Sequence, residues 1–161
     1  MKRKLLLFAA ILASCTTLFG QAFIWEGFDA GQMPPTGWTI SGYPDQWSIS
    51  NSNNAGGTSP EAMFTYVNSN GLSRLISPSV DLTGHTSIKL SFKHYYDFYA
   101  TGPKIGLATR SQGGSWNMVW EVTPTGNVGP EQKDFDISNS DVGSSNFQFC
   151  LYITGNLYNV D

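Results

Sequence analysis

Two histidines, His85 and His94, are the only side chains of this chain that could act as imidazole bases or imidazole metal ligands. No His-Glu-x-x-His, Cys-x-x-Cys or Gly-x-Ser-x-Gly spacing occurs. His94 lies in an alternating run between Phe92 and Tyr96, where a hydrogen-bonded core histidine is the expected role. Paired carboxylates for glycoside hydrolysis are disfavoured by so few acids on an antiparallel scaffold. We therefore expect a protein that is not an enzyme.

Sugar binding is the second chemistry that these side chains could support. Flat aromatic rings stack on pyranose rings, while neighbouring Asn, Gln and Asp side chains bond the hydroxyl groups. Tyr43, Trp47, Tyr95 and Tyr99 lie in or beside expected loops or on the outward face of an expected strand, and they are the candidate ligand-binding residues. The alternative is structural, since aromatic residues make up 14% of the chain and a sandwich core needs them.

The elements that must position these residues are short strands. From residue 23 onward, alternating apolar runs are separated by clusters of Gly, Pro, Asn and Ser, which is typical of a sandwich or barrel, and no convincing helix is present. The expected strands are residues 23–28, 38–41, 47–50, 62–67, 74–77, 88–98, 104–109, 118–122, 132–137 and 147–153.

Two of these strands show the clearest alternation between faces. In residues 88–98 the expected core face carries Leu90, Phe92, His94, Tyr96 and Phe98, and the other face carries Ser91, Lys93, Tyr95 and Asp97. In residues 147–153 the inward set is Phe147, Phe149, Leu151 and Ile153, with Gln148 and Tyr152 outward. Each of these strands therefore presents one face to a core.

About ten strands suffice for two packed antiparallel sheets with aromatic side chains between them. We predict an all-β, jelly-roll-like sandwich of two antiparallel sheets. Residues 112–115 are expected to form a hairpin turn and residues 51–59 a polar loop. The tryptophans expected in the core or packed against hairpins are Trp25, Trp38, Trp116 and Trp120.

The chain begins with an export signal. Lys2, Arg3 and Lys4 precede an apolar run over residues 5–18, which is too short for a bilayer-spanning helix. We expect a signal peptide over residues 1–20 with cleavage near 20–22, a single domain over residues 21–161, and a secreted or cell-surface protein without a membrane span. The alternative is a lipoprotein anchored through Cys15, because residues 12–15 also fit a lipobox.

Charge and cysteine content narrow the class of protein further. After cleavage Cys150 remains alone, so no intramolecular disulfide can form, and this residue is expected to be a small buried hydrophobe. The formal net charge of -3, with few scattered Lys and Arg residues, lacks the basic stripe that a phosphate backbone requires. Nucleic acid is therefore not expected as a partner.

Several motifs occur in a recognisable order. Residues 26–31 read Glu-Gly-Phe-Asp-Ala-Gly, residues 34–40 read Pro-Pro-Thr-Gly-Trp-Thr-Ile, and residues 75–84 read Leu-Ile-Ser-Pro-Ser-Val-Asp-Leu-Thr-Gly. Together with residues 88–98 and 105–116, they resemble the cleaved-adhesin and choice-of-anchor modules, relatives of MAM domains, found in large exported bacterial proteins including the gingipains. The resemblance spans about residues 23–161.

The resemblance implies a structural calcium ion that ties the first strand to the last. Glu26, Asp29 and Asp161 occupy the matching positions, although Glu26 and Asp29 could equally be ordinary strand and turn residues. Two departures weaken the match. The turn at residues 111–114 lacks the family's acidic residue, and the terminal motif stops at Asp161, so the final strand is expected to be missing.

These observations predict a non-catalytic, exported adhesion module that recognises an extracellular protein or glycan. The alternative is a structural accessory domain that spaces or stabilises neighbouring domains in a larger secreted peptidase or surface protein. The residues do not choose between the two, because binding loops on such a fold change freely.

Overall fold

Nine strands and two short 3-10 helices form the regular structure of residues 22–159, the part of the chain that the computed structural model describes. The strands are β1 (Thr39–Ser41), β2 (Trp47–Ser50), β3 (Glu61–Phe64), β4 (Asn70–Ile76), β5 (Ile88–Tyr96), β6 (Lys104–Ser111), β7 (Asn117–Val122), β8 (Val128–Ile137) and β9 (Phe147–Asn156). The 3-10 helices are η1 (Pro44–Gln46) and η2 (Leu157–Asn159). The expected signal peptide and Asp161 lie outside the described residues.

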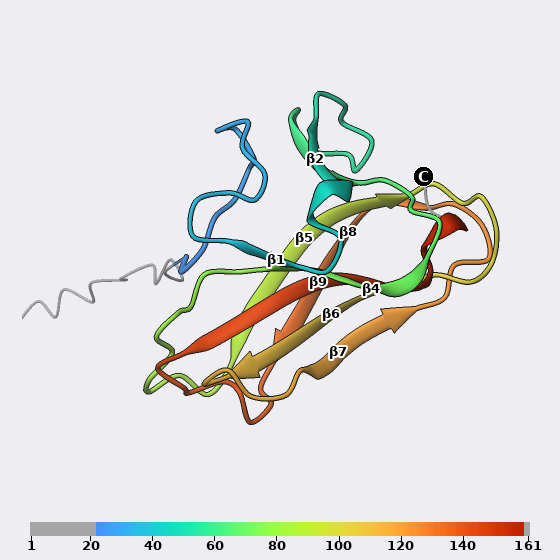
Figure 1. Cartoon of the computed structure of the whole chain (residues 1–161). Helices are drawn as coiled ribbons and strands as arrows, with labels where there is room; N and C mark the ends of the chain where they lie inside the picture. Colours follow the sequence, from blue (N-terminus) through green and yellow to red (C-terminus); the bar gives the residue numbers. More distant parts are fainter. Residues whose placement is uncertain (1–21, 160–161) are drawn as a thin grey trace, which may run out of the picture.

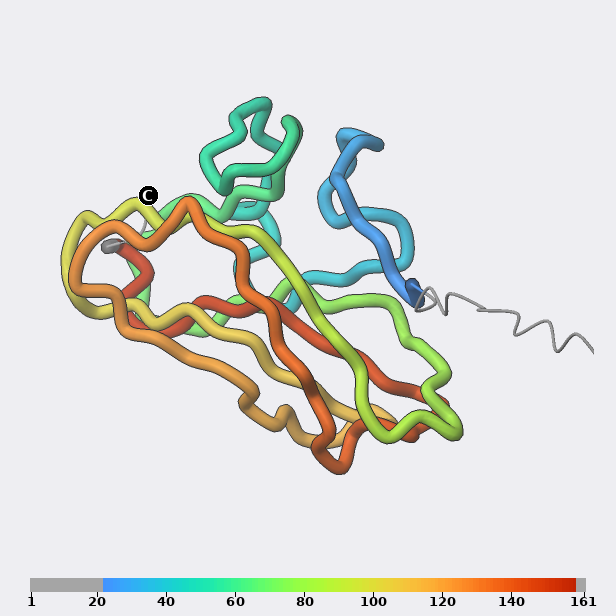
Figure 2. The backbone as a smooth tube through the Cα atoms, turned by 180° about the vertical axis from the view of Figure 1, so that it is seen from behind, coloured from blue at the N-terminus to red at the C-terminus, as the bar shows by residue number. Residues whose placement is uncertain are grey.

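The strands form two layers, as the sequence predicts. One layer is a five-stranded antiparallel sheet in the order β1-β4-β9-β6-β7, and the other contains the antiparallel pair β5-β8 (Figure 1). The β2-β3 hairpin forms a separate pair beside β5. In the view from behind, β5 and β8 lie across the five-stranded sheet (Figure 2). The all-β sandwich is therefore confirmed.

The core lies between these layers. Leu107 of β6 is fully buried and packs with Leu90 of β5 and Ile137 of β8. Phe92 stacks on Phe135 with their ring centroids 5.9 Å apart. The period-2 pattern of β5 thus placed its apolar face correctly, because alternate side chains of a strand point to opposite sides of the sheet.

The turn between β6 and β7 is the expected hairpin turn. Gln112 and Gly113 both have positive φ, 52° and 69°, and the Gly114 amide donates to the Ser111 carbonyl over 2.9 Å. Positive φ at both central residues defines a type I′ turn, whose twist matches that of the flanking strands.

The first expected strand is wrong. Residues 23–28 form no strand, because the chain turns at Phe28, which has a φ of 60°, and the Phe28 amide is bonded by the Glu26 side chain. Trp25 is also not a core residue, since 87% of it is exposed. Trp38, by contrast, is buried and makes an edge contact with Phe149, as expected.

β4 and β8 each begin four residues earlier than the sequence indicates, and β6 and β9 also run further than expected. β4 begins at Asn70 because it pairs with β9 as far as Asn156, and β8 begins at Val128 opposite Tyr96. Ladder pairing with a neighbour extends both strands through polar and Gly residues that interrupt the local pattern. No helix among residues 22–159 is long and apolar enough to cross a membrane.

Candidate functional site

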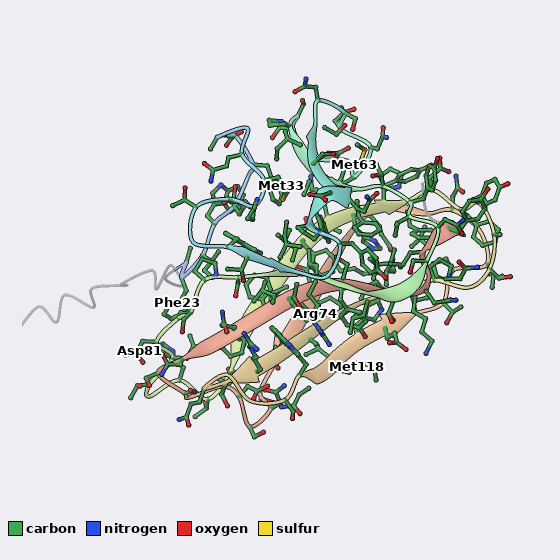
Figure 3. The ribbon with its side chains drawn as sticks, in the orientation of Figure 1. Phe23, Met33, Met63, Arg74, Asp81 and Met118 are labelled. Atoms are coloured by element: carbon green, nitrogen blue, oxygen red, sulfur yellow. The ribbon has the colours of Figure 1, made fainter. Side chains whose placement is uncertain are left out.

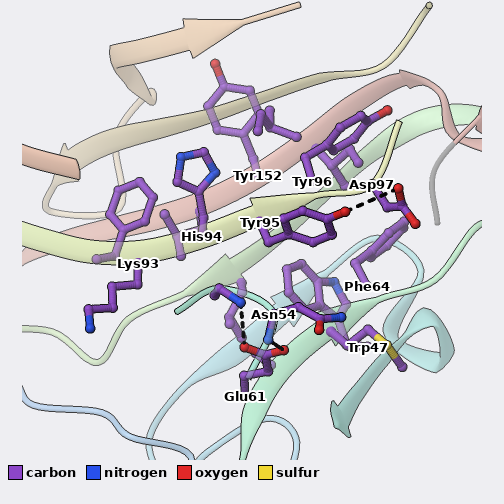
Figure 4. Close-up of a pocket in the computed structure, with 18 of the residues that line it drawn as sticks. Trp47, Asn54, Glu61, Phe64, Lys93, His94, Tyr95, Tyr96, Asp97 and Tyr152 are labelled. Carbon is purple, nitrogen blue, oxygen red and sulfur yellow. Dashed lines mark hydrogen bonds between the residues drawn. The ribbon is translucent and has the colours of Figure 1, made fainter. Parts of the chain in front are cut away.

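A cleft of about 310 Å³ opens between β5 and the β2-β3 hairpin. Its walls combine aromatic and polar side chains, and β6 and β9 contribute apolar residues behind them (Figure 4). The lining from β5, the β2-β3 hairpin and their flanking residues includes Trp47, Asn54, Glu61, Phe64, Lys93, His94, Tyr95, Tyr96 and Asp97. A concave, mainly apolar site with a few convergent polar groups is the usual form of a small-ligand site.

Tyr95 lines this cleft together with Lys93 and Asp97, its neighbours on the outward face of β5. The ladder between β5 and β8 shifts register between His94 and Tyr96, where two steps along β5 face three steps along β8, so the extra residue lies on β8. The Tyr95 hydroxyl accepts a hydrogen bond from Asn127 Nδ2 over 3.0 Å and donates to Asp97 Oδ1 over 3.4 Å. These two hydrogen bonds therefore fix the hydroxyl end of the half-buried Tyr95 side chain.

Trp47 is fixed in the opposite wall. Its indole Nε1 donates to Ser73 Oγ over 2.8 Å, and Ser73 in turn donates to the Gly42 carbonyl over 2.6 Å. The Trp47 ring makes an edge contact with Phe64, with centroids 5.3 Å apart. In the view of Figure 4, Tyr95 lies between Tyr96 above and the Trp47–Phe64 pair below.

Glu61 organises the polar loop at the mouth of the cleft. Its Oε1 accepts hydrogen bonds from Ser52 Oγ over 2.6 Å and from the Asn54 amide over 2.9 Å, while Oε2 accepts from the Ala55 amide over 3.0 Å. Three bonds to one carboxylate hold the loop over residues 51–59 against β3. Glu61 therefore has a structural role in this loop.

His94 is a half-buried, hydrogen-bonded core histidine, as predicted. Its Nε2 lies 3.1 Å from Glu131 Oε1, and Glu131 also pairs with Lys133 Nζ over 2.9 Å. The ring packs edge-on against Trp120, with centroids 5.5 Å apart. Burial lowers the pKa of His94 below its usual 6.5, and Glu131 partly opposes that shift.

The lowered pKa of His94 predicts a pH-dependent stability. The unfolded chain binds this proton more tightly than the folded protein, so stability is full above the usual pKa and is lost as pH falls through it towards the lowered folded value. The melting temperature should therefore be lower at about pH 5.5 than at about pH 7.5, with a smaller difference in His94→Gln. His85→Gln is the control for removing an imidazole, and a full pH effect in His94→Gln would contradict the assignment.

The other two predicted ligand residues lie outside the cleft. The Tyr43 hydroxyl is bonded to Ser69 Oγ at 3.0 Å and to the Asn70 carbonyl at 3.1 Å, and the Tyr43 ring covers Gly71. Tyr99 is 65% exposed and contacts Tyr158 at 6.4 Å between centroids. Of the four candidates, the structure brings together Trp47 and Tyr95.

Tyr99 belongs to a separate surface patch, which we call the tyrosine patch and define as Tyr66, Tyr99 and Tyr158. All three rings are exposed, and Tyr66 also contacts Tyr158, at 5.9 Å between centroids. These side chains come from three distant segments, so their proximity is invisible in the sequence.

The structure describes two of the three predicted calcium ligands, Glu26 and Asp29. Glu26 Oε1 accepts the Phe28 amide over 2.6 Å, and Asp29 lies two residues from Gly27 with its carboxylate folded back towards that glycine. Within residues 22–159 no group of three or more His, Cys, Asp and Glu side chains could hold a metal ion. Asp161 lies outside the described residues, so calcium binding stays a prediction.

The polar residues that line the cleft were not predicted from the sequence. Asn54 and Lys93 line it, and Asp97 lies beside Tyr95. Lys93 and Asp97 were expected on the outward face of β5, which is where they are, but nothing in the sequence indicated that the β2-β3 hairpin would turn this face into one wall of a cleft. The run of Asn and Ser over residues 51–54 was the one available signal, since such loops often carry ligand contacts.

Comparisons with known proteins show a similarity of fold. No protein-family model matches the chain, and no curated protein sequence matches it. Among solved structures, TmCBM61, determined in complex with β-1,4-galactotriose, is similar with a TM-score of 0.60 at 21% identity, over 86% of this chain and 90% of that chain. The likeness supports the sandwich architecture described above.

Two cleaved adhesin domains of Lys-gingipain from Porphyromonas gingivalis W83 are also similar. K1 has a TM-score of 0.49 at 16% identity, over 76% of this chain and 88% of that domain. K3 has a TM-score of 0.48 at 15% identity, over 80% of this chain and 92% of that domain. Cleaved adhesin domains are among the solved structures that this chain resembles.

Proposed function

We propose that this protein is a non-catalytic binding module that holds an uncharged oligosaccharide in the cleft between β5 and the β2-β3 hairpin. The observation that carries the proposal is the pairing of Tyr95 and Trp47 in one cleft whose edge bears Asn54, Lys93 and Asp97. Aromatic rings present flat apolar faces to sugar rings, and the amide, ammonium and carboxylate groups can bond hydroxyls. The similar fold of TmCBM61, solved with a β-1,4-linked galactotriose, adds support.

The acids of the cleft favour binding over hydrolysis. Glycosidases require two carboxyl groups on either side of the scissile bond, one of them with a raised pKa. Both Glu61 carboxylate oxygens are engaged by the loop that they hold. Asp97 is exposed and bonded to Tyr95. Neither acid is arranged as a general acid towards the cleft.

The test is a calorimetric titration of the protein with β-1,4-galactotriose and with a panel of other neutral oligosaccharides. We expect saturable binding to at least one of them with one site per chain. If none binds at millimolar concentration, the cleft is not a saccharide site, and the alternative of a structural accessory domain gains support. Binding that is lost in Tyr99→Ala rather than in a cleft variant would move the site to the tyrosine patch.

The place of action proposed here is outside the cytoplasm. The basic residues 2–4 and the apolar run over residues 5–18 support export with cleavage near residues 20–22. N-terminal sequencing of the exported protein tests this, because a first residue at 21–23 is expected, whereas a lipidated Cys15 would identify the lipoprotein alternative.

Calcium binding is proposed on the resemblance, in which Glu26 and Asp29 occupy the matching positions. A cation bound only to the folded state should raise the melting temperature by a few degrees in millimolar calcium relative to chelator. Asp29→Ala should remove that difference. Asp45→Ala is the matched control, since Asp45 lies in η1. An equal calcium effect in wild type and Asp29→Ala would remove Asp29 from the site.

A further inference from the structure

The outer face of the five-stranded sheet carries a layered cluster around Trp116. This face points away from β5 and β8, and in the view of Figure 1 no described segment crosses it. Ile76, Ala108 and Cys150 form an apolar base on this face, and the half-buried Trp116 ring packs on that base. Burial raises the pKa of the Cys150 thiol to about 12, so the base is uncharged.

Two guanidinium groups flank the Trp116 ring. The Cζ of Arg110 lies 4.4 Å from the ring centroid, and that of Arg74 lies 5.6 Å from it. Figure 3 shows Arg74 on the side of the sheet that faces the viewer. Arg110 also donates from Nε and Nη2 to Gln148 Oε1, over 3.0 and 2.8 Å. An indole and an amide therefore hold Arg110 in place, and both are neutral.

The positive charge of these two arginines is not compensated by a nearby acid. They are the only arginines after Arg3, and across residues 22–159 neither makes an ion pair with a carboxylate. The acid of this face, Glu121, is already engaged by Lys104 Nζ at 2.7 Å and by the Tyr152 hydroxyl at 2.9 Å. Lys104 is thus paired, whereas Arg74 and Arg110 are available to an external anion.

We propose that this face is a second binding site, which takes an anionic saccharide and holds its carboxylate or sulfate group between Arg74 and Arg110. A guanidinium presents its N–H donors in a rigid fork that matches the oxygens of such groups. Stacking on Trp116 orients the forks in advance, so little side-chain freedom is lost on binding. The open strand surface suits an extended chain of sugars.

A saccharide fits this face better than an acidic protein does. A protein partner usually inserts an aromatic or aliphatic anchor into a pocket at the centre of its contact. Here the central ring, Trp116, is covered by Arg110 on one side and by the apolar base on the other. The inference does not depend on the proposed cleft, which lies on the opposite side of the sheet and is expected to take uncharged sugars.

The test is a titration of the protein at low salt with three probes: trigalacturonate, a sulfated galactose oligosaccharide and neutral galactotriose. We expect at least one acidic probe to bind, and the binding to weaken as salt is added. Arg110→Gln and Arg74→Gln should each weaken it at least ~10-fold, because each removes charge-assisted hydrogen bonds. Lys104→Gln, which removes a paired cation of the same face, should change it by less than about 2-fold. Comparing the two acidic probes shows whether the site recognises a carboxylate or a sulfate group.

Three results would overturn the proposal. The first is that neither acidic saccharide binds at low salt. The second is that both arginine variants, folded as judged by their unfolding curves, bind like the wild type. The third is that a glutamate-rich peptide binds as tightly as the saccharides. Tyr95→Ala tests whether the two sites are separate. This cleft variant should bind the acidic saccharide like the wild type, whether or not the cleft takes a neutral sugar. Loss of acidic binding in Tyr95→Ala would contradict a second site.

Discussion

Tyr95→Ala is expected to weaken binding of the neutral oligosaccharide by about 30-fold. A central aromatic contact contributes about 2 kcal/mol to recognition, and a tenfold change in affinity corresponds to ~1.4 kcal/mol. Tyr95 is the ring of β5 that lies in the cleft between the hairpin wall and Tyr96. Calorimetric titration of wild type and variant with the same sugar measures the effect.

Two further substitutions serve as controls for this result. Tyr95→Phe keeps the ring and removes only the hydroxyl that bonds Asn127, so it should retain most of the affinity. Tyr99→Ala removes a more exposed tyrosine ring, from the tyrosine patch outside the cleft, and should leave affinity unchanged. If Tyr95→Ala bound the sugar as tightly as Tyr95→Phe does, stacking on this ring would not be the basis of recognition.

Leu107→Ala is expected to reduce the free energy of unfolding by about 3 kcal/mol. Leu107 is fully buried between the layers, where it packs with Leu90 of β5 and Ile137 of β8. Truncation removes buried apolar surface and leaves a cavity that a two-layer core closes only partly. Urea or guanidinium unfolding of both proteins, with equal slopes, gives the difference directly.

Met118→Ala is the matched control for the core prediction. Met118 belongs to the neighbouring strand β7, but its side chain is 66% exposed on the outer face of the same sheet. A change below about 0.5 kcal/mol is expected there. Similar losses of unfolding free energy in both variants would mean that the two faces of the sheet contribute equally to stability. The assignment of the core to the space between the layers would then be wrong.

The strand faces were predictable because they follow a local rule. Side chains alternate along a strand, so Leu90 and Phe92 could be placed on the core face of β5, and Phe149 and Leu151 on that of β9, before any partner strand was known. The turn at Gln112 and Gly113 was predictable for a similar reason, since a short polar Gly-rich segment between two apolar runs closes a hairpin.

The cleft was only half predictable. Trp47 and Tyr95 were candidates by residue type and expected exposure, but they share a cleft because the β2-β3 hairpin lies beside β5. The position of that hairpin cannot be read from the period-2 pattern of β5, which indicates only the two faces of the strand. For the same reason Tyr43 and Tyr99, which look equivalent in the sequence, lie elsewhere.

Residues 23–28 show how a local pattern can mislead. Their apolar residues suggested a strand, yet a strand forms only where a neighbour supplies a hydrogen-bonded ladder, and the turn at Phe28 prevents one. Trp25 is consequently exposed instead of buried.

By itself the sequence determined the all-β class, the buried faces of the long strands and the absence of recognisable catalytic motifs, because these depend on residue type and on spacing within a few positions. Only the tertiary structure decided which rings share the cleft and that Arg74, Arg110 and Trp116 meet on one face. The pairing of Arg74 with Tyr152 and of Arg110 with Gln148 across β9 sets that meeting. Strand order and register join residues that are far apart in the chain, so spacing along the sequence carries no information about them.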